Sequence, residues 1–417
     1  MAKICVLGLG YIGLPTASIL ASNGYKVIGV DISEKVIESL SKGNVHIQEP
    51  GLKTLVQSAI FSGNLKVSMS PEQADVFIIT VPTPVRNSKA DLTMVKSASK
   101  NIIPYLRKGS LVILESTVPP GTTNGLVAKI LSESGLKAGK EIGLAYCPER
   151  VLPGNILKEL VGNSRIIGGI TKESSSAAKK IYETFVEGEI LITDSNTAEM
   201  VKLIENTFRD VNIALANELA LIAENINVNI WDAINLANRH PRVNLHKPGP
   251  GVGGHCIAVD PWFLVETSPK FAKLIKLARN INDDMPKYVA DIVSKQLIGI
   301  KKPVISIFGV SYKGNVEDVR ESPAISVINA LKKKGCILKC YDPLAKNFEY
   351  KLMSLNDAVK ESDCILILAD HKEFLKINPV SIAKFMRKKI LVDTRNYVRH
   401  ALWRNAGFKI KILGGIS

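Results

Sequence analysis

A glycine-rich segment of the sequence leads to a cysteine and then to an aspartate. Residues 248–262 read PGPGVGGHCIAVDPW, with four glycines in the six residues 249–254. Glycines let a backbone approach a ligand closely, and a cysteine that ends such a loop is a candidate nucleophile. Asp260 before Pro261 also has a plain explanation, because Asp caps helices and Pro suits their first position. The segment predicts covalent chemistry at Cys256, with a buried structural thiol as the alternative.

Three polar side chains recur at helical spacing further up the chain. Lys202, Asn206 and Arg209 follow one another at i, i+4 and i+7, so they share one face of an expected helix. A solvated stripe is the ordinary explanation of such a face. Apolar neighbours such as Leu203 and Phe208 leave little plainly solvent-facing surface, so a functional face stays open as the second interpretation.

The start of the chain carries a phosphate-binding pattern. Residues 8–13 read GLGYIG between a strand at 3–7 and a helix at 12–22. Glycines at these positions allow a tight turn, close approach of pyrophosphate and close packing of helix on strand. An acid about 20 residues further on binds ribose hydroxyls and repels a 2′-phosphate, which favours NAD over NADP. The predicted cofactor contacts of this region are Gly8, Gly10, Tyr11, Ile12, Gly13 and Asp31.

Strand and helix patterns must position these groups. Apolar strands alternate with helices over residues 3–195 and again after 301, and 197–225 predicts one long helix without glycine or proline. The sequence therefore predicts an α/β protein with two Rossmann-like, doubly wound parallel sheets joined by a helical region. The expected domains are 1–195, 196–298 and 299–417. Strands are expected at 3–7, 26–30, 76–81, 111–115, 143–147, 165–168, 304–310, 336–341, 364–368 and 390–392.

Composition limits the classes of partner. The net charge is +15, but the lysines are spread along the chain and form no block of five like charges, which disfavours nucleic acid. Apolar runs are too short to cross a bilayer, and we expect a cytoplasmic protein that binds no membrane. Six scattered cysteines show no metal-ligand spacing, so we expect no metal site.

Further polar segments follow the expected strands. They read VPTP at 81–84, ESTVPPGT at 115–122 and CPERVLPGN at 147–155. Together with GLGYIGLP, the cysteine loop and GVSYKGNVEDVRESPA at 309–324, they resemble the UDP-glucose/GDP-mannose dehydrogenases. The resemblance covers essentially the whole chain in the same order. It implies an NAD-dependent, four-electron oxidation of the C6 hydroxyl of a UDP-sugar to a carboxylate.

The resemblance implies roles at matching positions. Cys256 forms a thiohemiacetal with the aldehyde and then a thioester. Lys202, with Asp260, assists proton movement and stabilises oxyanions, and Asn206 donates to the same oxygen. Preorganised donors of this kind are typically worth about 2.7–4 kcal/mol each. Glu149 is similar to the carboxylate that helps to activate the hydrolytic water.

The resemblance also implies contacts to both ligands. Thr117 lies near the nicotinamide, and Thr83 and Arg320 are further expected cofactor contacts. The last domain holds UDP, and Arg242 reaches the site across a subunit interface in a homodimer or a homotetramer. The expected substrate contacts are Arg150, Val151, Lys202, Asn206, Arg209, His240, Arg242, Gly253, Tyr312 and Lys313.

Departures from the family pattern favour one sugar. Val252 and Val259 stand where UDP-glucose enzymes carry Phe and Lys, and Arg150 replaces an aromatic residue. This pattern resembles the branch that oxidises UDP-N-acetyl-D-mannosamine, with UDP-N-acetylglucosamine and UDP-glucose as alternatives. A single-step hydroxy-acid type of dehydrogenase and a non-enzymatic NAD-bound sensor are the competing classes. His255 is expected to be structural.

Overall fold

The first strand has an apolar side chain at every position after its first. β1 (Lys3–Leu7) buries Ile4 and Val6 in a core on one face of its sheet, and Cys5 and Leu7 in a core on the other face. A strand that is apolar on both faces requires cover on both sides, which helices supply in doubly wound folds.

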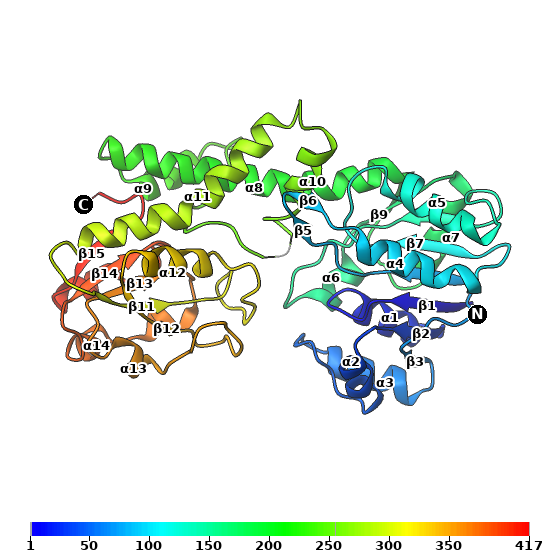
Figure 1. The fold of residues 1–417 in the computed structure, drawn as a ribbon, viewed down its shortest axis with the longest axis horizontal. Coiled ribbons are helices and arrows are strands. Elements are labelled where there is room, and N and C mark those ends of the chain that lie inside the picture. Colours follow the sequence, from blue (N-terminus) through cyan, green and yellow to red (C-terminus); the bar gives the residue numbers. More distant parts are fainter. Residues whose placement is uncertain (1, 255, 417) are drawn as a thin grey trace. The chain divides into compact units, whose positions relative to one another are not determined.

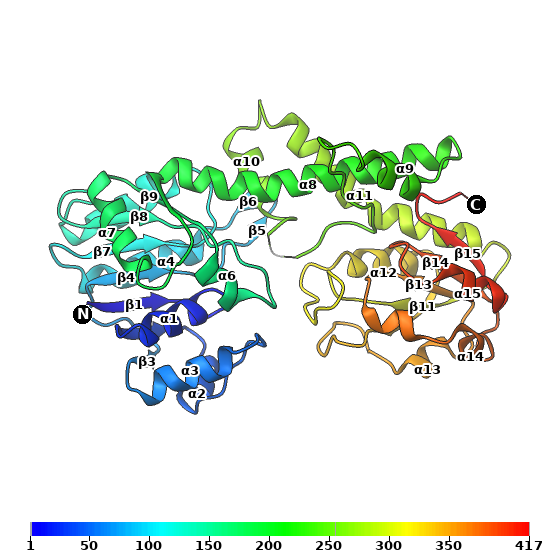
Figure 2. The ribbon, with the colours of Figure 1, turned by 180° about the vertical axis from the view of Figure 1, so that it is seen from behind.

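The computed structural model describes residues 2–254 and 256–416. The chain divides into two units, each with its own parallel-rich sheet (Figure 1, Figure 2). The first unit runs to Glu205 and also contains Trp262–Pro269, and the second contains Asn206–Pro261 and the chain from Lys270 onward.

The sheet of the first unit has eight strands in the order β10-β9-β8-β7-β4-β1-β2-β3. The remaining strands of this unit are β2 (Lys26–Val30), β3 (Leu65–Ser68), β4 (Val76–Ile79), β7 (Leu111–Leu114), β8 (Gly143–Tyr146), β9 (Arg165–Gly169) and β10 (Ile190–Asp194), with a small hairpin of β5 (Val85–Arg86) and β6 (Lys89–Ala90). The helices are α1 (Gly13–Ser22), α2 (Glu34–Ser41), α3 (Leu52–Phe61), α4 (Thr93–Ile102), α5 (Ala128–Leu131), α6 (Ile156–Gly162) and α7 (Lys172–Tyr182).

One pairing departs from the predicted parallel sheet. β9 runs antiparallel to β8, with Tyr146 opposite Gly168, and β10 then pairs in parallel with β9. Apart from the short β5–β6 hairpin, three strands of the two sheets were absent from the prediction: β3, β10 and, in the second unit, β15 (Lys409–Ile412). All three are edge strands. Edge strands are half exposed and mix polar with apolar residues, so they lack the continuous apolar run of a central strand.

The second unit contains a five-stranded parallel sheet in the order β12-β11-β13-β14-β15. Its other strands are β11 (Val304–Phe308), β12 (Ile337–Tyr341), β13 (Cys364–Ile367) and β14 (Ile390–Asp393). Its helices are α9 (Ile230–Ala237), α11 (Lys273–Gln296), α12 (Pro323–Lys333), α13 (Leu355–Val359), α14 (Pro379–Ala383) and α15 (His400–Asn405). Two Rossmann-like sheets and a helical region between them in the sequence confirm the predicted α/β class.

The long helix of the prediction is α8 (Ser195–Asn225), and a short helix, α10 (Asp260–Thr267), follows the cysteine loop. Within the second unit, Asp210 of α8 is fully buried and bonds both Arg279 and Asn282 of α11. Asn282 accepts a hydrogen bond from Asn217, which in turn holds the backbone N–H of Gly249. This buried polar network ties α8 and α11 to the start of the cysteine loop.

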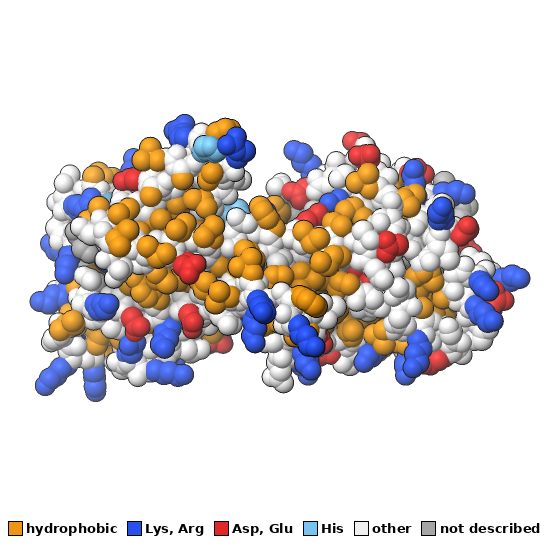
Figure 3. All heavy atoms as spheres, turned by 90° about the horizontal axis from the view of Figure 1, so that it is seen from above, with side chains coloured by type: hydrophobic (Ala, Val, Ile, Leu, Met, Phe, Trp, Pro, Cys, Tyr) orange, Lys and Arg blue, Asp and Glu red, His pale blue; other side chains and the backbone are white. Residues whose placement is uncertain are grey.

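Hydrophobic side chains remain exposed on the helices of the second unit (Figure 3). Phe208, Leu215 and Ile222 of α8 lie seven residues apart and are 65%, 42% and 49% exposed. Large exposed apolar patches on a protein surface mark sites of interaction with other molecules. Among the described residues, no helix has both the length and the apolar character needed to span a bilayer.

Candidate active site

The glycine motif follows β1 and has the geometry that dinucleotide binding requires. Gly8 has a φ of +95°, which only glycine adopts without strain. A Cβ on Gly13 would overlap the carbonyl oxygen of Gly8, so the start of α1 lies directly on the turn. A Cβ on Gly10 would meet nothing within 4 Å. The first and third glycines are therefore required by the protein itself, whereas the second leaves space for a ligand.

Asp31 and Thr80 hold this turn in place. The Asp31 carboxylate accepts the backbone N–H of Leu9 at 2.9 Å and that of Ser33 at 2.9 Å. Each carboxylate oxygen keeps a further lone pair, so both remain able to accept a ribose hydroxyl. Thr80, at the end of β4, contacts the carbonyl oxygens of Leu7 and Gly8 at 2.9 and 2.8 Å.

The neighbouring strand ends carry the other predicted cofactor contacts. Tyr11 and Ile12 lie in the glycine turn just before α1, and Thr117 is half-buried beyond β7. Thr83 follows β4, and its buried Oγ1 finds no hydrogen-bond partner among the residues that the structure describes. An orphaned buried hydroxyl calls for an explanation, and a bound ligand supplies one. Ser116, which donates to the carbonyl of Val81 at 2.7 Å, joins the two loops.

The loop after β8 brings together three predicted residues. Lys202 of α8 donates to the backbone carbonyl of Glu149 at 2.7 Å. Arg150 forms an ion pair with Glu205 at 2.8 Å and bonds Ser164, and Val151 packs against the core beside α1. The structure therefore places Lys202, Glu149 and Arg150 at one end of the first sheet.

A buried ionic cluster lies at the same strand ends. Arg165, 4% exposed, contacts the carboxylates of Glu149 and Glu115 and stacks on the ring of Tyr182 at 4.5 Å. The Tyr182 hydroxyl donates to Glu115 at 2.5 Å. Burial, partly offset by the charge of Arg165, raises the pKa of the Glu115 carboxyl to about 7. Desolvation disfavours a buried carboxylate even when one cation faces it.

In the second unit, Cys256, Asn206 and Asp260 come together. The backbone N–H of Asp260 donates to the carbonyl of Cys256 at 2.8 Å, so a single turn separates the cysteine from α10. The Asn206 side chain donates to the buried Asp260 carboxylate at 2.5 Å. The predicted helix start at Asp260 is confirmed. His255 lies outside the described residues.

Cys256 differs from the other cysteines in its accessibility. Its side chain is exposed. Burial raises the pKa of Cys5 and Cys147 to about 12 and that of Cys340 to about 11, and it also raises the pKa of Cys336 and Cys364. Since the thiolate is the nucleophile, these five thiols are poor candidates at neutral pH.

The cysteine loop packs on the third predicted domain. A Cβ on Gly253 would lie 2.5 Å from the carbonyl oxygen of Glu321 and 3.0 Å from the Tyr312 Cβ. A Cβ on Gly254 would lie 3.1 Å from the Tyr312 ring. Lys313, the next residue after Tyr312, is exposed. Arg320 forms a two-point ion pair with Asp318, at 2.9 and 2.6 Å. Gly253 and Tyr312 are thus neighbours, as their shared assignment to the substrate requires.

The remaining predicted substrate contacts lie on the surface of the second unit. Arg209, His240 and Arg242 are exposed, and the backbone N–H of Arg242 donates to the His240 ring at 3.3 Å. Their predicted contacts with substrate stay predictions.

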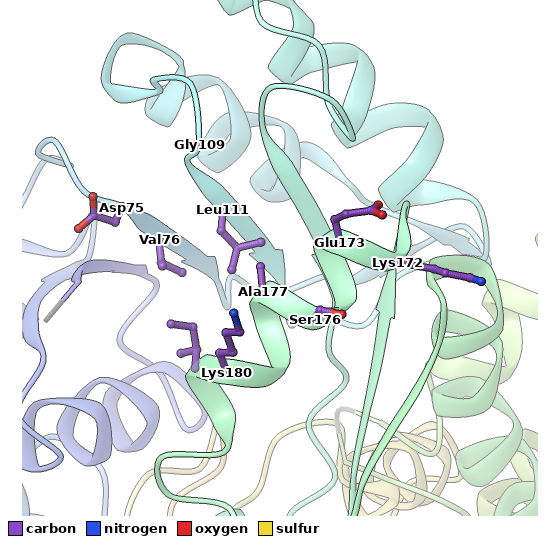
Figure 4. Close-up of a pocket in the computed structure, with 10 residues that line it drawn as sticks. Asp75, Val76, Gly109, Leu111, Lys172, Glu173, Ser176, Ala177 and Lys180 are labelled. Atoms are coloured by element: carbon purple, nitrogen blue, oxygen red, sulfur yellow. The ribbon is translucent and has the colours of Figure 1, made fainter.

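A groove of about 540 Å³ lies away from these loops (Figure 4). It is lined by Val76 and Leu111, the first residues of β4 and β7, and by Lys172 and Lys180 of α7. The glycine turn follows the opposite, carboxyl end of the sheet, where open α/β sheets bind their ligands. The groove therefore does not belong to the cofactor site.

Comparison with known proteins decides the family. Residues 2–186, 196–284 and 306–400 match the NAD binding, central and UDP binding domains of the UDP-glucose/GDP-mannose dehydrogenase family. The chain belongs to this family. It is therefore an enzyme, an NAD-dependent dehydrogenase, and the predicted resemblance and cofactor are confirmed.

Individual relatives cover the chain from end to end. A protein of Methanococcus aeolicus named UDP-N-acetyl-D-mannosamine dehydrogenase is 55% identical, over 99% of this chain and 95% of the relative. A solved UDP-D-ManNAc dehydrogenase from Pyrococcus horikoshii has a TM-score of 0.94 and 43% identity, covering 99% of both chains. The UDP-N-acetyl-mannosamine dehydrogenase of Staphylococcus aureus has a TM-score of 0.89 and 46% identity, over 99% of this chain and 98% of the other.

The first unit of this family member fits NAD. Gly10 has an open side that a ligand can approach, Asp31 keeps lone pairs free for ligand hydroxyls, and the buried Thr83 hydroxyl has no hydrogen-bond partner among the described residues. Thr80, Ser116 and Arg165 were not predicted as site residues. The spacing of motifs in the sequence cannot predict these three residues, because each contacts a segment that is distant in the sequence.

Alanine at Gly13 and at Gly10 should affect the dehydrogenase differently. Gly13→Ala forces α1 away from the turn, so we expect a loss of roughly 1–3 kcal/mol in unfolding free energy and weaker NAD binding. Gly10→Ala should stay within about 0.5 kcal/mol of wild type and still bind NAD at least about tenfold more weakly. Thermal unfolding without NAD and a fluorescence titration with NADH measure both effects. Unchanged NADH affinity in Gly10→Ala contradicts the proposed position of the pyrophosphate.

Glu115→Gln should change the pH dependence of stability. Between pH 4.5, the ordinary pKa, and about 7, Glu115 keeps its proton in the folded chain but loses it in the unfolded chain. The unfolding free energy of wild type therefore falls as pH rises through this window, and glutamine removes that loss. We expect the variant to gain up to about 3 kcal/mol on wild type between pH 4.5 and 8. Denaturant unfolding at four pH values tests this, and a constant difference contradicts it.

Proposed function

We propose that this dehydrogenase oxidises the C6 hydroxyl of UDP-N-acetyl-D-mannosamine to the carboxylate, through a covalent intermediate on Cys256. The observation that carries the proposal is the exposed thiol of Cys256, one turn before the Asp260–Asn206 pair. An accessible cysteine beside polar donors suits covalent capture of an aldehyde, which retains the intermediate between two oxidations.

The choice of sugar rests on the loop sequences. Val252, Val259 and Arg150 depart from the pattern of UDP-glucose enzymes, and relatives at 55% identity carry the name of the mannosamine enzyme. Arg150 is held by Glu205 and Ser164, so its guanidinium has a defined position at the end of β8.

The proposed chemistry comprises two oxidations, of the alcohol to the aldehyde and of the thiohemiacetal to the thioester. NAD, when bound, would supply the hydride acceptor for both. The Cys256 sulfur adds to the aldehyde carbon, and the resulting thiohemiacetal is oxidised to a thioester. Asn206, held by Asp260, donates a hydrogen bond to the oxygen of these intermediates, and the ammonium of Lys202 stabilises its negative charge. Preorganised donors of this kind act most strongly where water is excluded.

Hydrolysis releases the product. We propose that Glu149 accepts a proton from the attacking water, which bonds to the acyl carbon as the C–S bond breaks and Cys256 leaves as the thiolate. Thr117 would lie beside the nicotinamide, and Gly8, Gly10, Tyr11, Ile12, Gly13, Asp31, Thr83 and Arg320 would hold the cofactor. Val151, Arg209, His240, Arg242, Gly253, Tyr312 and Lys313 would contact the UDP-sugar.

We further propose three domains at 1–195, 196–298 and 299–417, and a homodimer. The exposed stripe of Phe208, Leu215 and Ile222 supports the homodimer, because apolar residues at heptad spacing suit pairing of two helices. A second copy of α8 would cover this stripe.

The reaction predicts two NADH per molecule of UDP-N-acetyl-D-mannosamine. Cys256→Ala should lose turnover to the acid by roughly 10³-fold or more, because no thioester forms. NADH absorbance and product mass, with UDP-glucose and UDP-N-acetylglucosamine in parallel, measure both quantities. One NADH per sugar favours a single-step dehydrogenase, and a faster reaction with another sugar overturns the proposed specificity.

Phe208→Asp should dissociate the dimer. Removing a buried Phe costs about 1.5–3 kcal/mol, and a buried carboxylate adds to this, so the dissociation constant should rise at least about tenfold. Phe61→Asp, at a residue that is 78% exposed on α3, is the matched control and should remain dimeric. Sedimentation velocity compares them. A wild-type monomer, or an unchanged Phe208→Asp dimer, contradicts this interface.

A further inference from the structure

Arg165 is a buried cation with a defined set of partners in the first unit. Its Nη2 contacts Oε2 of Glu149, and its Nη1 lies 3.4 Å from Oε1 of Glu115 and 3.5 Å from the Cys147 sulfur. The guanidinium also stacks on Tyr182. A guanidinium has a rigid planar fork, so these contacts fix its orientation as well as its charge.

The antiparallel strand β9 explains this arrangement. Tyr146 pairs with Gly168 and Ala145 with Gly169, and the same register continued for three residues sets Glu149 opposite Arg165. Arg165 is the first residue of β9, so it lies beside the carboxyl end of β8. A parallel β9 would have placed its first residue at the other end of the sheet.

Glu149 is held at both carboxylate oxygens. Oε1 accepts the backbone N–H of Arg150 at 2.7 Å, and Oε2 contacts Arg165. These two contacts leave one lone pair free on each oxygen, so the carboxylate stays able to accept a proton while its direction is fixed. A general base acts only when its oxygen lies within hydrogen-bond reach of the water.

Glu115 anchors the other side of the guanidinium. It is 4% exposed and accepts a hydrogen bond from the Tyr182 hydroxyl at 2.5 Å, and its Oε2 has no hydrogen-bond partner within residues 2–254 and 256–416. Burial raises its pKa to about 7. Burying a second carboxyl here costs desolvation free energy. Ion pairs that are buried this deeply add little to folding stability, so stability alone does not explain Glu115.

We propose that Arg165, anchored by Glu115, is a positioning residue that aims the Glu149 carboxylate at the water that hydrolyses the Cys256 thioester. The inference rests on the proposed function, in which Glu149 is the base. Arg165 does not touch the substrate and takes no part in the two hydride transfers.

The assignment predicts a defect confined to hydrolysis. In Arg165→Lys the compact ammonium lacks the rigid planar fork of the guanidinium, so Glu149 loses its fixed direction. On mixing full-length enzyme with NAD and UDP-N-acetyl-D-mannosamine, we expect a burst of two NADH per subunit at close to the wild-type rate. Steady turnover should then fall roughly 10- to 100-fold, since general-base catalysis contributes about 10²–10⁴-fold. Intact mass after quenching should show the acyl group on the protein.

Two further variants complete the experiment. At pH 8, above the pKa of about 7 of the Glu115 carboxyl, Glu115→Gln keeps the shape of the side chain but removes its charge, and it should accumulate the same adduct to a smaller extent. Arg107→Lys makes the same chemical change in an exposed ion pair with Asp75, and it should behave as wild type. If Arg165→Lys does not fold, Glu115→Gln alone tests the proposed role of Arg165.

The outcomes separate the two proposals. Wild type that yields one NADH per sugar overturns the proposed function. Wild type that yields two NADH, with variants that lose burst and steady turnover equally and carry no adduct, overturns the role of Arg165. A purely structural role would weaken every phase together, whereas a positioning role delays the last one.

Discussion

Strand direction is the constraint on which the first unit depends. The loops that follow parallel strands all lie at the same edge of the sheet. The glycine turn after β1, Thr80 after β4 and Ser116 after β7 are therefore neighbours, although they are far apart in sequence. β9 runs against this direction, and its first residue therefore lies at the edge where the other strands end. The one antiparallel pairing of this sheet brings the buried cation of Arg165 to the edge where Glu115 and Glu149 lie.

Charge burial at that edge has a physical cost. Arg165, Glu115 and Glu149 are each less than 10% exposed, and removing ions from water is repaid only by well-formed contacts. The stacking of Arg165 on Tyr182 and the hydroxyl bond to Glu115 supply part of that compensation. The raised pKa of Glu115 shows that the compensation is incomplete. Incomplete compensation is typical of sites that serve chemistry rather than stability.

In the second unit, contacts within the protein hold the irregular loop before Cys256. Four glycines before Cys256 suggested close approach of a ligand, but the structure gives three of them a role within the protein. Gly251 lies near Pro286 and Pro323, and Gly253 and Gly254 lie against Tyr312. The buried chain from Asp210 through Asn282 and Asn217 to Gly249 fixes the start of the same loop. Cys256, which follows this loop, is exposed.

The sequence by itself determined those features of the structure that depend on adjacent residues or on the burial of an apolar run. The tight turn at Gly8 and Gly13, the central strands, the long helix and the start of α10 followed from periodicity and local turn chemistry, because these signals are confined to a few adjacent residues. Only the tertiary structure decided the direction of β9, the edge strands and the partners of Arg165. Pairing between distant strands depends on which surfaces remain to be buried when the chain folds, and no local pattern encodes that.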